Sequence, residues 1–214
     1  MTIDDILQAG AVMPVVVIDD AAHAVPLARA LVAGGIRAIE ITLRTGAALD
    51  AVQAIARDVP DAIPGVGTAL TGADVLAVLD AGAKFIVSPG ATPALLQAAI
   101  GSGLPFLPGI ATASELMAGM AAGLSAFKFF PAAQAGGVEG LKALGGPFPK
   151  ARFCPTGGVS AANAAAYLAL PNVACVGGSW IAPREVIAAG DFARIEQLAR
   201  EAAALRTPPR PAPG

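Results

Sequence analysis

One of the four lysines in this 214-residue chain lies in the middle of an apolar, strand-like run. Lys128 is flanked by aromatic residues in the sequence Ala-Phe-Lys-Phe-Phe-Pro. The other lysines precede a strand, lie in a helix or lie in a connection: Lys84, Lys142 and Lys150. Because an ammonium group is costly to bury, these surroundings favour the neutral amine, the nucleophile that forms a Schiff base with a ketone. The alternative is a lysine paired with an acid for purely structural reasons.

A single acid stands out in the same way. Glu40 lies within the run Ala38 to Leu43, whereas nearly all of the other acids fall in predicted helices or connections. Strand alternation puts Glu40 and Arg44 on one face at different heights. Glu40 is then a candidate general acid/base. Arg44, nearer the mouth, is a candidate for binding a carboxylate through two parallel hydrogen bonds. An internal structural network of Glu40, Arg44 and Lys128 is the alternative.

Small and glycine-rich strand ends predict where an anionic substrate would bind. Two of them follow the last two predicted strands, where backbone N–H groups of many barrels receive a phosphate. They contain Thr156, Gly157 and Gly158, and then Gly178 and Ser179. Thr68, Pro89 and Phe130, the last on the same face as Lys128, complete the candidate substrate-binding set. Each glycine pair also fits a simple tight turn.

Strand-like and helix-like segments alternate along the chain at intervals of about twenty residues, which predicts a TIM (β/α)8 barrel. The expected strands are Met13 to Ile18, Ala38 to Leu43, Ile63 to Gly67, Phe85 to Pro89, Phe106 to Ile110, Ala126 to Pro131, Arg152 to Thr156 and Val173 to Gly177. Thr71, Thr92, Thr112 and Ser160 are the expected helix caps. An open doubly wound sheet is the alternative fold.

The ends of the chain differ from this repeat. Residues 1–8 predict an extra N-terminal helix that could cover the bottom of the barrel. We expect residues 1–205 to form a single (β/α)8 barrel domain and residues 206–214 to form a Pro-rich C-terminal tail that cannot bury a core.

Composition limits the partners. Hydrophobic residues make up 55% and charged residues 14%, the net charge is -2, and no basic block is present, so no nucleic acid partner is expected. Two long uncharged stretches are interrupted by proline and glycine, which argues against membrane spans. No secretory signal is visible, so a cytoplasmic location is expected. A small molecule is the expected partner.

The sequence has few residues that could bind a metal or a cofactor. His23 is the only histidine, and it is expected on a helix surface. Cys154 and Cys175 stand in separate strand-like runs without CxxC spacing and are interpreted as buried free thiols. We expect no metal and no cofactor.

From about Gly10 to Ala203 the chain resembles the 2-keto-3-deoxy-6-phosphogluconate and 4-hydroxy-2-oxoglutarate aldolases, which are class I, Schiff-base enzymes. The matching motifs are Glu-Ile-Thr-Leu-Arg-Thr from Glu40, Gly-Val-Gly-Thr ending at Thr68, Ser-Pro-Gly around Pro89, Phe-Lys-Phe-Phe-Pro around Lys128, Arg-Phe-Cys-Pro-Thr-Gly-Gly ending at Gly158 and Gly-Gly-Ser-Trp around Ser179. One departure is Ala133-Gln134 at a position where the family usually has an acid.

The resemblance implies a function in the Entner–Doudoroff pathway. Lys128 would form the Schiff base, Glu40 would be the general acid/base, and Arg44 and Thr68 would hold the pyruvyl carboxylate. Thr156, Ser179 and the neighbouring glycines would bind the phosphorylated aldehyde half. The resemblance also implies a homotrimer. The alternatives are a 2-keto-3-deoxy-6-phosphogalactonate aldolase, a sugar-phosphate epimerase or isomerase, and a non-catalytic sugar-phosphate-binding barrel.

Overall fold

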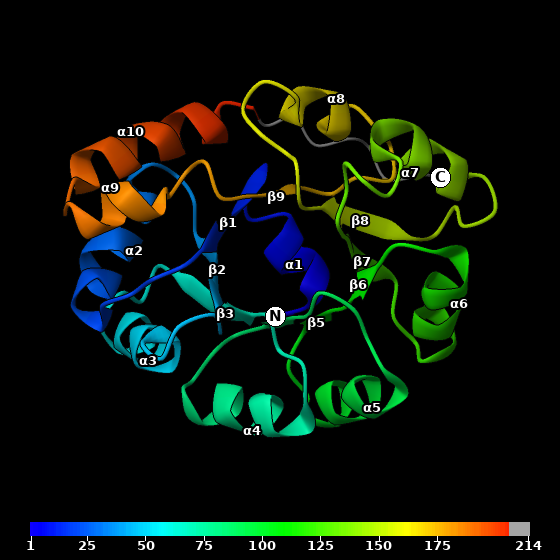
Figure 1. Cartoon of the computed structure of the whole chain (residues 1–214), viewed down its shortest axis with the longest axis horizontal. Helices are drawn as coiled ribbons and strands as arrows, with labels where there is room; N and C mark the ends of the chain where they lie inside the picture. The colour runs from blue at the N-terminus through cyan, green and yellow to red at the C-terminus, as the bar shows by residue number, and fades with distance from the viewer. Residues whose placement is uncertain (206–214) are drawn as a thin grey trace.

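The strands form a closed ring with helices around it, as the computed structural model of the protein shows (Figure 1). The structure describes residues 1–205, and the predicted Pro-rich tail, 206–214, lies outside the described residues. The strands are β1 Val12–Val16, β2 Ala38–Thr42, β3 Ile63–Gly67, β4 Ile86–Val87, β5 Phe106–Leu107, β6 Gly109–Ile110, β7 Ala126–Phe129, β8 Arg152–Pro155 and β9 Val176–Gly178. All the strand pairings are parallel.

Two seams close this ring. One sheet runs in the order β5-β4-β3-β2-β1-β9 and the other in the order β6-β7-β8. Pro108 alone separates β5 from β6, and it interrupts the strand because proline cannot donate a ladder hydrogen bond. The two short strands together therefore occupy one strand position of the barrel. Isolated bridges join Phe153 to Val173 and Thr156 to Gly177 and close the second seam. The predicted TIM barrel is confirmed, and the alternative of an open sheet is wrong.

Helices cover the outside of the ring (Figure 1). They are α2 Ala24–Ala33 after the 3-10 turn η1 Ala21–His23, α3 Ala48–Asp58, α4 Gly72–Asp80, α5 Pro93–Gly101, α6 Ala113–Ala121, α7 Gly137–Gly145, α8 Ala164–Leu168, α9 Arg184–Ala188 and α10 Phe192–Ala203. The hydroxyls of Thr71, Thr92 and Thr112 cap α4, α5 and α6 by accepting backbone N–H bonds, as predicted.

The predicted cap at Ser160 is wrong. Helix α8 begins three residues later, after Asn163. The Asn163 side chain accepts a hydrogen bond from the Ser160 backbone N–H and donates one to the Gly158 carbonyl oxygen. Because this side chain satisfies the loop backbone, it supports the turn that follows Gly158 rather than a helix that starts at Ser160.

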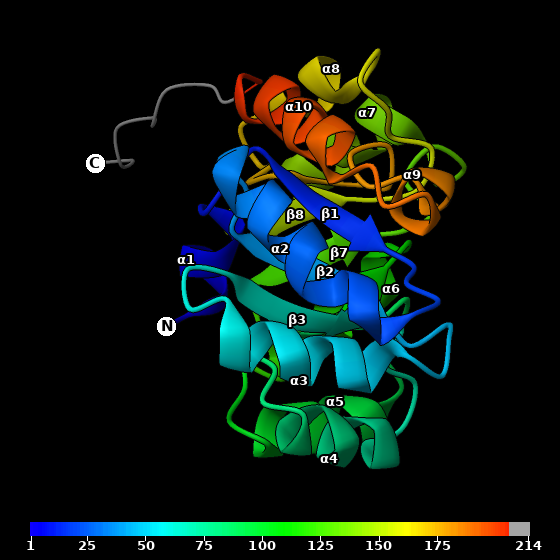
Figure 2. The same ribbon diagram turned by 90° about the vertical axis from the view of Figure 1, so that its left-hand side faces the viewer.

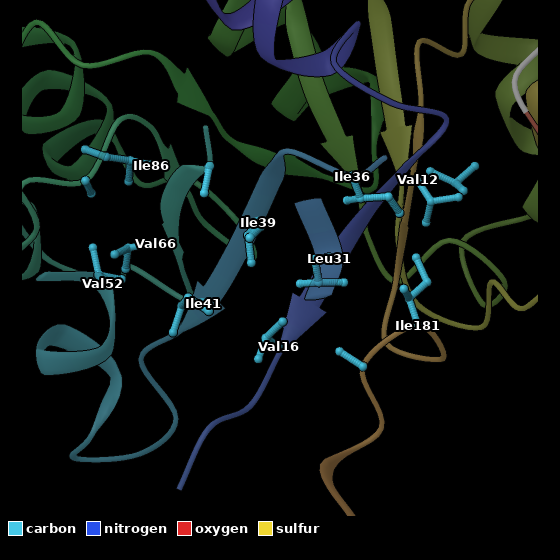
Figure 3. Close-up of a cluster of buried hydrophobic side chains, with 14 of the residues drawn as sticks. Val12, Val16, Leu31, Ile36, Ile39, Ile41, Val52, Val66, Ile86 and Ile181 are labelled. Atoms are coloured by element: carbon cyan, nitrogen blue, oxygen red, sulfur yellow. The ribbon is translucent and has the colours of Figure 1, made fainter. Parts of the chain in front are cut away.

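Alternating side chains along each strand divide the apolar interior into two cores. The larger core lies between the ring and the helices, and Figure 3 shows its β1–β4 side, including Val16, Ile39, Ile41 and Val66. The smaller core lies inside the ring and consists of Ile6, Leu7, Met13, Ala38, Phe85, Val87, Leu107, Ala126, Cys154 and Cys175. This two-sided burial explains why the strands have few polar residues.

Helix α1, Ile3–Leu7, closes one end of the ring. In Figure 2 it lies on the side from which β1 starts, which is the amino-terminal end of the parallel strands. Ile6 and Leu7 are buried in the inner core, and a capping box of Thr2 and Asp5 fixes the start of the helix. The predicted N-terminal helix is therefore present but shorter than residues 1–8. Within residues 1–205, none of the helices has the length and apolarity that a membrane crossing requires.

Candidate active site

Lys128 and Glu40 meet inside the ring, although 88 positions separate them in the sequence. Lys128 Nζ donates a hydrogen bond to Glu40 Oε1 over 3.0 Å. Only 4% of Lys128 and 2% of Glu40 is exposed. Strand β7 positions the lysine and β2 positions the acid, and both residues lie on the inward face that the alternation predicts. An ion pair withdrawn this far from water is costly, which indicates that it is retained for a purpose other than stability.

Gly67 leaves the space that the Glu40 carboxylate occupies. A Cβ atom at Gly67 would lie 2.1 Å from Glu40 Oε1, closer than any real contact. The last residue of β3 must therefore have no side chain if the acid is to reach toward Lys128. The glycine of the predicted Gly-Val-Gly-Thr segment thus has a steric role in the site as well as a role in the turn.

Aromatic rings surround Lys128 on both faces of β7. The Phe130 ring lies on the inner side, with its centroid 5.4 Å from Lys128 Nζ, within the range of a cation–π contact. Phe127 and Phe129 point outward and pack against Phe153 with ring centroids 6.4 and 6.5 Å apart. Gly157 lies beside Phe130, where a Cβ atom would be 3.3 Å from the ring. The Lys128 amine therefore has the Phe130 ring beside it as well as the Glu40 carboxylate.

Two candidate carboxylate-binding residues lie at the mouth. Arg44 follows the end of β2 at Thr42 and is exposed, so it lies in a turn rather than in the strand that the alternation assumed. Among residues 1–205, the ion pairs do not include Arg44. Thr68 directly follows β3 and has a positive φ of 65°, which is uncommon for a residue other than glycine and typical of functional sites. The structure thus gives Arg44 no contact with Glu40 or Lys128.

The ends of β8 and β9 form a second polar part of the mouth. Thr156 is buried, and its hydroxyl donates to the Cys154 carbonyl oxygen over 3.3 Å. Gly157 and Gly158 have φ values of 93° and 76°, a conformation that favours glycine. Gly178 is buried at the end of β9 and Ser179 is exposed next to it. Backbone N–H groups at two adjacent strand ends suit an anion.

Other parts of the site were less predictable. Pro89 lies against Gly109, where a Cβ atom would be 2.1 Å from the Pro89 carbonyl oxygen, so Gly109 lets β4 and β6 approach each other. The buried Ser88 hydroxyl has no hydrogen-bond partner within residues 1–205. Gly109 follows Pro108, and no local signal distinguished it from an ordinary turn glycine. The packing partner comes from another strand, which the local sequence does not specify.

The two cysteines lie below this site and close to each other. Cys175 Sγ and Cys154 Sγ are 3.5 Å apart, and both thiols are free and buried. The expectation of buried free thiols is met, but their contact was not anticipated. Cys154 lies on the same strand face as Thr156, and Cys175 on the same face as Gly177. Alternation along these two neighbouring strands could therefore have revealed the contact between the thiols.

The described residues offer this site no cluster of metal ligands. Among residues 1–205, no group of three or more histidines, cysteines and acids is placed to hold a metal ion. His23 lies in η1 and makes an edge contact with Phe192, with ring centroids 5.9 Å apart. What the arrangement offers is an amine and a carboxylate in contact inside the ring, with a cation and backbone donors at the ends of the strands. That combination suits imine formation and proton transfer on an anionic carbonyl compound.

Comparison with known proteins gives a consistent result. Residues 3–198 match the family model described as KDPG and KHG aldolase. The chain is 55% identical over 199 residues to the KHG/KDPG aldolase of Escherichia coli K12, with 93% of each chain covered. It resembles a KDPG aldolase structure from Legionella pneumophila with a TM-score of 0.93 and 46% identity, over 95% of this chain and 98% of that one.

A second solved structure, the 2-keto-3-deoxy-6-phosphogluconate aldolase of Zymomonas mobilis ZM4, is similar with a TM-score of 0.90 and 44% identity, over 96% of this chain and 97% of that one. Family model, sequence relatives and structures agree over nearly the full length. This chain belongs to the KDPG and KHG aldolase family.

Proposed function

We propose that this protein is a class I aldolase that cleaves 2-keto-3-deoxy-6-phosphogluconate to pyruvate and glyceraldehyde 3-phosphate through a Schiff base on Lys128. The observation that carries the proposal is the 3.0 Å contact between Lys128 Nζ and Glu40 Oε1 inside the ring. A carboxylate in contact with the amine is placed to take a proton from it and to return that proton during the reaction. Lys128 then has the lone pair that the reaction needs.

The reaction follows from these two groups. The Lys128 amine attacks C2 of the keto acid, and Glu40 returns the proton it took, so that water leaves, a protonated imine remains and Glu40 is again a carboxylate. Glu40 takes the proton of the C4 hydroxyl as the C3–C4 bond breaks and its electrons move into the imine to give an enamine. The aldehyde departs. Protonation of the enamine at C3 and hydrolysis then release pyruvate and regenerate the amine.

The mouth residues bind the two ends of the substrate in this proposal. Arg44 and Thr68 hold the pyruvyl carboxylate, because an unpaired guanidinium at the mouth can bind a carboxylate through two parallel hydrogen bonds. Thr156, Gly157, Gly158, Gly178 and Ser179 bind the hydroxyls and the phosphate of the aldehyde half, and Pro89 and Phe130 line the site. Fixed orientation of this kind can contribute several kcal/mol to the lowering of the barrier.

The relatives support this assignment by what they contain. The Legionella pneumophila structure holds pyruvate captured as a covalent carbinolamine intermediate, and the Zymomonas mobilis structure holds 3-phosphoglycerate. The name of the Escherichia coli relative includes a second activity, so we propose 4-hydroxy-2-oxoglutarate as a second substrate, cleaved to pyruvate and glyoxylate. Specificity constants for these two compounds and for 2-keto-3-deoxy-6-phosphogalactonate test the choice of substrate.

Trapping of the imine tests the chemistry. The protein is incubated with pyruvate and borohydride and then digested, and the peptides are examined by mass spectrometry. We expect the reduced adduct on Lys128 and its complete loss in Lys128→Arg, because a guanidinium cannot supply a neutral nucleophile. Lys84→Arg is the matched control, since Lys84 is exposed and precedes β4. An unmodified Lys128 in the native protein would favour an epimerase, an isomerase or a non-catalytic binding barrel instead.

We also propose that residues 1–205 form one domain, which assembles as a homotrimer in the cytoplasm. Large apolar side chains remain exposed on or next to the successive outer helices α4, α5 and α6, Leu76 of α4 by 64% and Met117 of α6 by 59%, together with Leu70, Leu79 and Ile100. Contact with other copies would cover such a patch. Two free thiols 3.5 Å apart suit a reducing compartment. Light scattering should give three copies for the native chain and fewer for Leu76→Glu.

A further inference from the structure

The catalytic scheme leaves the pair of buried thiols below Lys128 and Glu40 without a role. Cys154 lies in β8, and Cys175 directly precedes β9. Each is 1% exposed, and the Cys175 thiol donates a hydrogen bond to Cys154 Sγ over 3.5 Å. Both side chains belong to the inner core of the ring. Two thiols in direct contact form a site that can undergo a reaction that one thiol alone cannot.

The geometry of the two strands suits a covalent bond between the sulfurs. Bridges at Phe153–Val173 and Thr156–Gly177 place the two segments side by side on either side of the pair. Neighbouring strands lie about 4.7–4.9 Å apart, and disulfides accept Cα separations of about 4.4–6.8 Å. The sulfurs must approach from 3.5 Å to about 2.0 Å, which rotation of the two side chains can supply.

The surroundings keep the pair reduced in the absence of a strong oxidant. The hydrogen bond to Cys154, burial and the nearby charge of Glu40 raise the pKa of Cys175 well above the usual value of a thiol. Since the thiolate is the reactive form, protonation slows the reaction of the pair with every oxidant, and burial additionally excludes bulky disulfides. A small oxidant that can enter the ring is required.

The two ends of the ring differ in what lies between the thiol pair and solvent. Ile6 and Leu7 of α1 pack in the same inner core and close the amino-terminal end of the ring. Toward the other end, Cys154 Sγ lies 3.9 Å from Thr156 Oγ1, and the charge of Glu40 acts on Cys175. The thiol pair therefore lies in the same interior of the ring as the Lys128–Glu40 pair.

We propose that Cys154 and Cys175 are a modification site, which hydrogen peroxide reaches through the mouth of the active site and converts into an intrachain disulfide, and that a keto acid held on Lys128 blocks this route. The blocking step rests on the proposed function. Peroxide oxidises one thiol to a sulfenic acid, with cleavage of the O–O bond and release of water. The second thiol attacks that sulfur, so that the S–S bond forms, the S–O bond breaks and a second water leaves.

The test compares two forms of the native chain. One carries the borohydride-reduced pyruvate adduct on Lys128, and the other is treated with borohydride alone. After borohydride is removed, both are exposed to peroxide, free thiols are alkylated under denaturing conditions, and the non-reducing digest is analysed by mass spectrometry. We expect a cross-linked Cys154–Cys175 peptide that dithiothreitol cleaves in the free form, and its loss in the adduct. Because no substitution is needed, the comparison does not depend on the folding of a variant.

The variants Cys154→Ala and Cys175→Ala are the controls for identity, and neither should give the intrachain cross-link. Absence of the cross-link in the free native chain would overturn the proposal, as would equal cross-linking with and without the adduct. If pyruvate forms no adduct, the proposed function fails separately, and the peroxide-treated free chain still decides whether the two thiols join.

Discussion

Glu40 reaches Lys128 only because Gly67 has no side chain. The carboxylate occupies the space where a Cβ atom at Gly67 would lie 2.1 Å from Oε1, and from there it accepts the hydrogen bond of the lysine over 3.0 Å. Three strands thus define the contact that we propose for proton transfer: β2 supplies the acid, β7 the amine and β3 the space. Each can be tested separately.

Substitution of Gly67 by alanine should displace the carboxylate. We expect a loss of stability of about 1–3 kcal/mol from overpacking, together with a large fall in kcat. Gly101→Ala is the matched control, because a Cβ atom at the end of α5 meets nothing within 4 Å. Thermal unfolding and cleavage assays measure the two effects. Normal turnover in Gly67→Ala would show that Glu40 need not occupy its observed position.

Glu40→Gln separates proton transfer from packing. The amide has the same shape and can still accept the hydrogen bond from Lys128, but it cannot take up a proton. We expect kcat to fall by about 10²- to 10⁴-fold, the usual contribution of a general acid/base, while the fold is retained. Glu139→Gln is the control, since Glu139 pairs with Lys142 on the surface of α7. A fall no larger than that of the control would contradict the role of Glu40.

Arg44→Lys tests recognition of the carboxylate. Lysine keeps the charge but lacks the planar guanidinium, which can donate two parallel hydrogen bonds to a carboxylate. We therefore expect kcat/KM to fall by about tenfold or more, the equivalent of one charge-assisted hydrogen bond. Arg57→Lys is the control, because Arg57 pairs with its neighbour Asp58 on the surface. Steady-state kinetics with the keto acid provide the measurement. Unchanged kinetics in Arg44→Lys would remove Arg44 from the site.

The cap of α6 predicts a pH-dependent contribution to stability. Hydrogen bonds from the backbone N–H of Ala111, and then from the hydroxyl and backbone N–H of Thr112, lower the pKa of Glu115. A carboxyl whose pKa is lowered by folding stabilises the protein at any pH above the pKa that the group has in the unfolded chain. This stability is lost as the pH falls through the pKa of the group in the folded protein. Urea unfolding should show Glu115→Gln about 1 kcal/mol less stable at neutral pH, with the difference shrinking in acid. A difference that is constant with pH would contradict this.

The parts of the fold that sequence predicted are those that depend on short-range pattern. Alternation placed Lys128 and Glu40 on inward faces, and threonine caps marked the starts of α4, α5 and α6. The errors arose where tertiary packing decides the outcome. Strand β2 ends at Thr42, so Arg44 leaves the alternation, and Asn163 rather than Ser160 precedes helix α8.

Contacts between distant strands were beyond the local pattern. Nothing near Gly109 in the sequence specifies Pro89 as its neighbour, and alternation suggests the Cys154–Cys175 contact only once their two strands are known to be adjacent. These contacts depend on the register of the whole ring, to which every strand contributes. Sequence therefore predicted which residues face inward better than it predicted which of them touch.

Closure of the ring by α1 has a kinetic consequence. Ile6 and Leu7 fill the amino-terminal end, so substrate and both products must use the opposite mouth. In the proposed scheme the aldehyde is free once the C3–C4 bond breaks, whereas the three-carbon fragment is still bonded to Lys128. Release is therefore ordered, with pyruvate last. Pyruvate should inhibit competitively against the keto acid, and the aldehyde should inhibit noncompetitively.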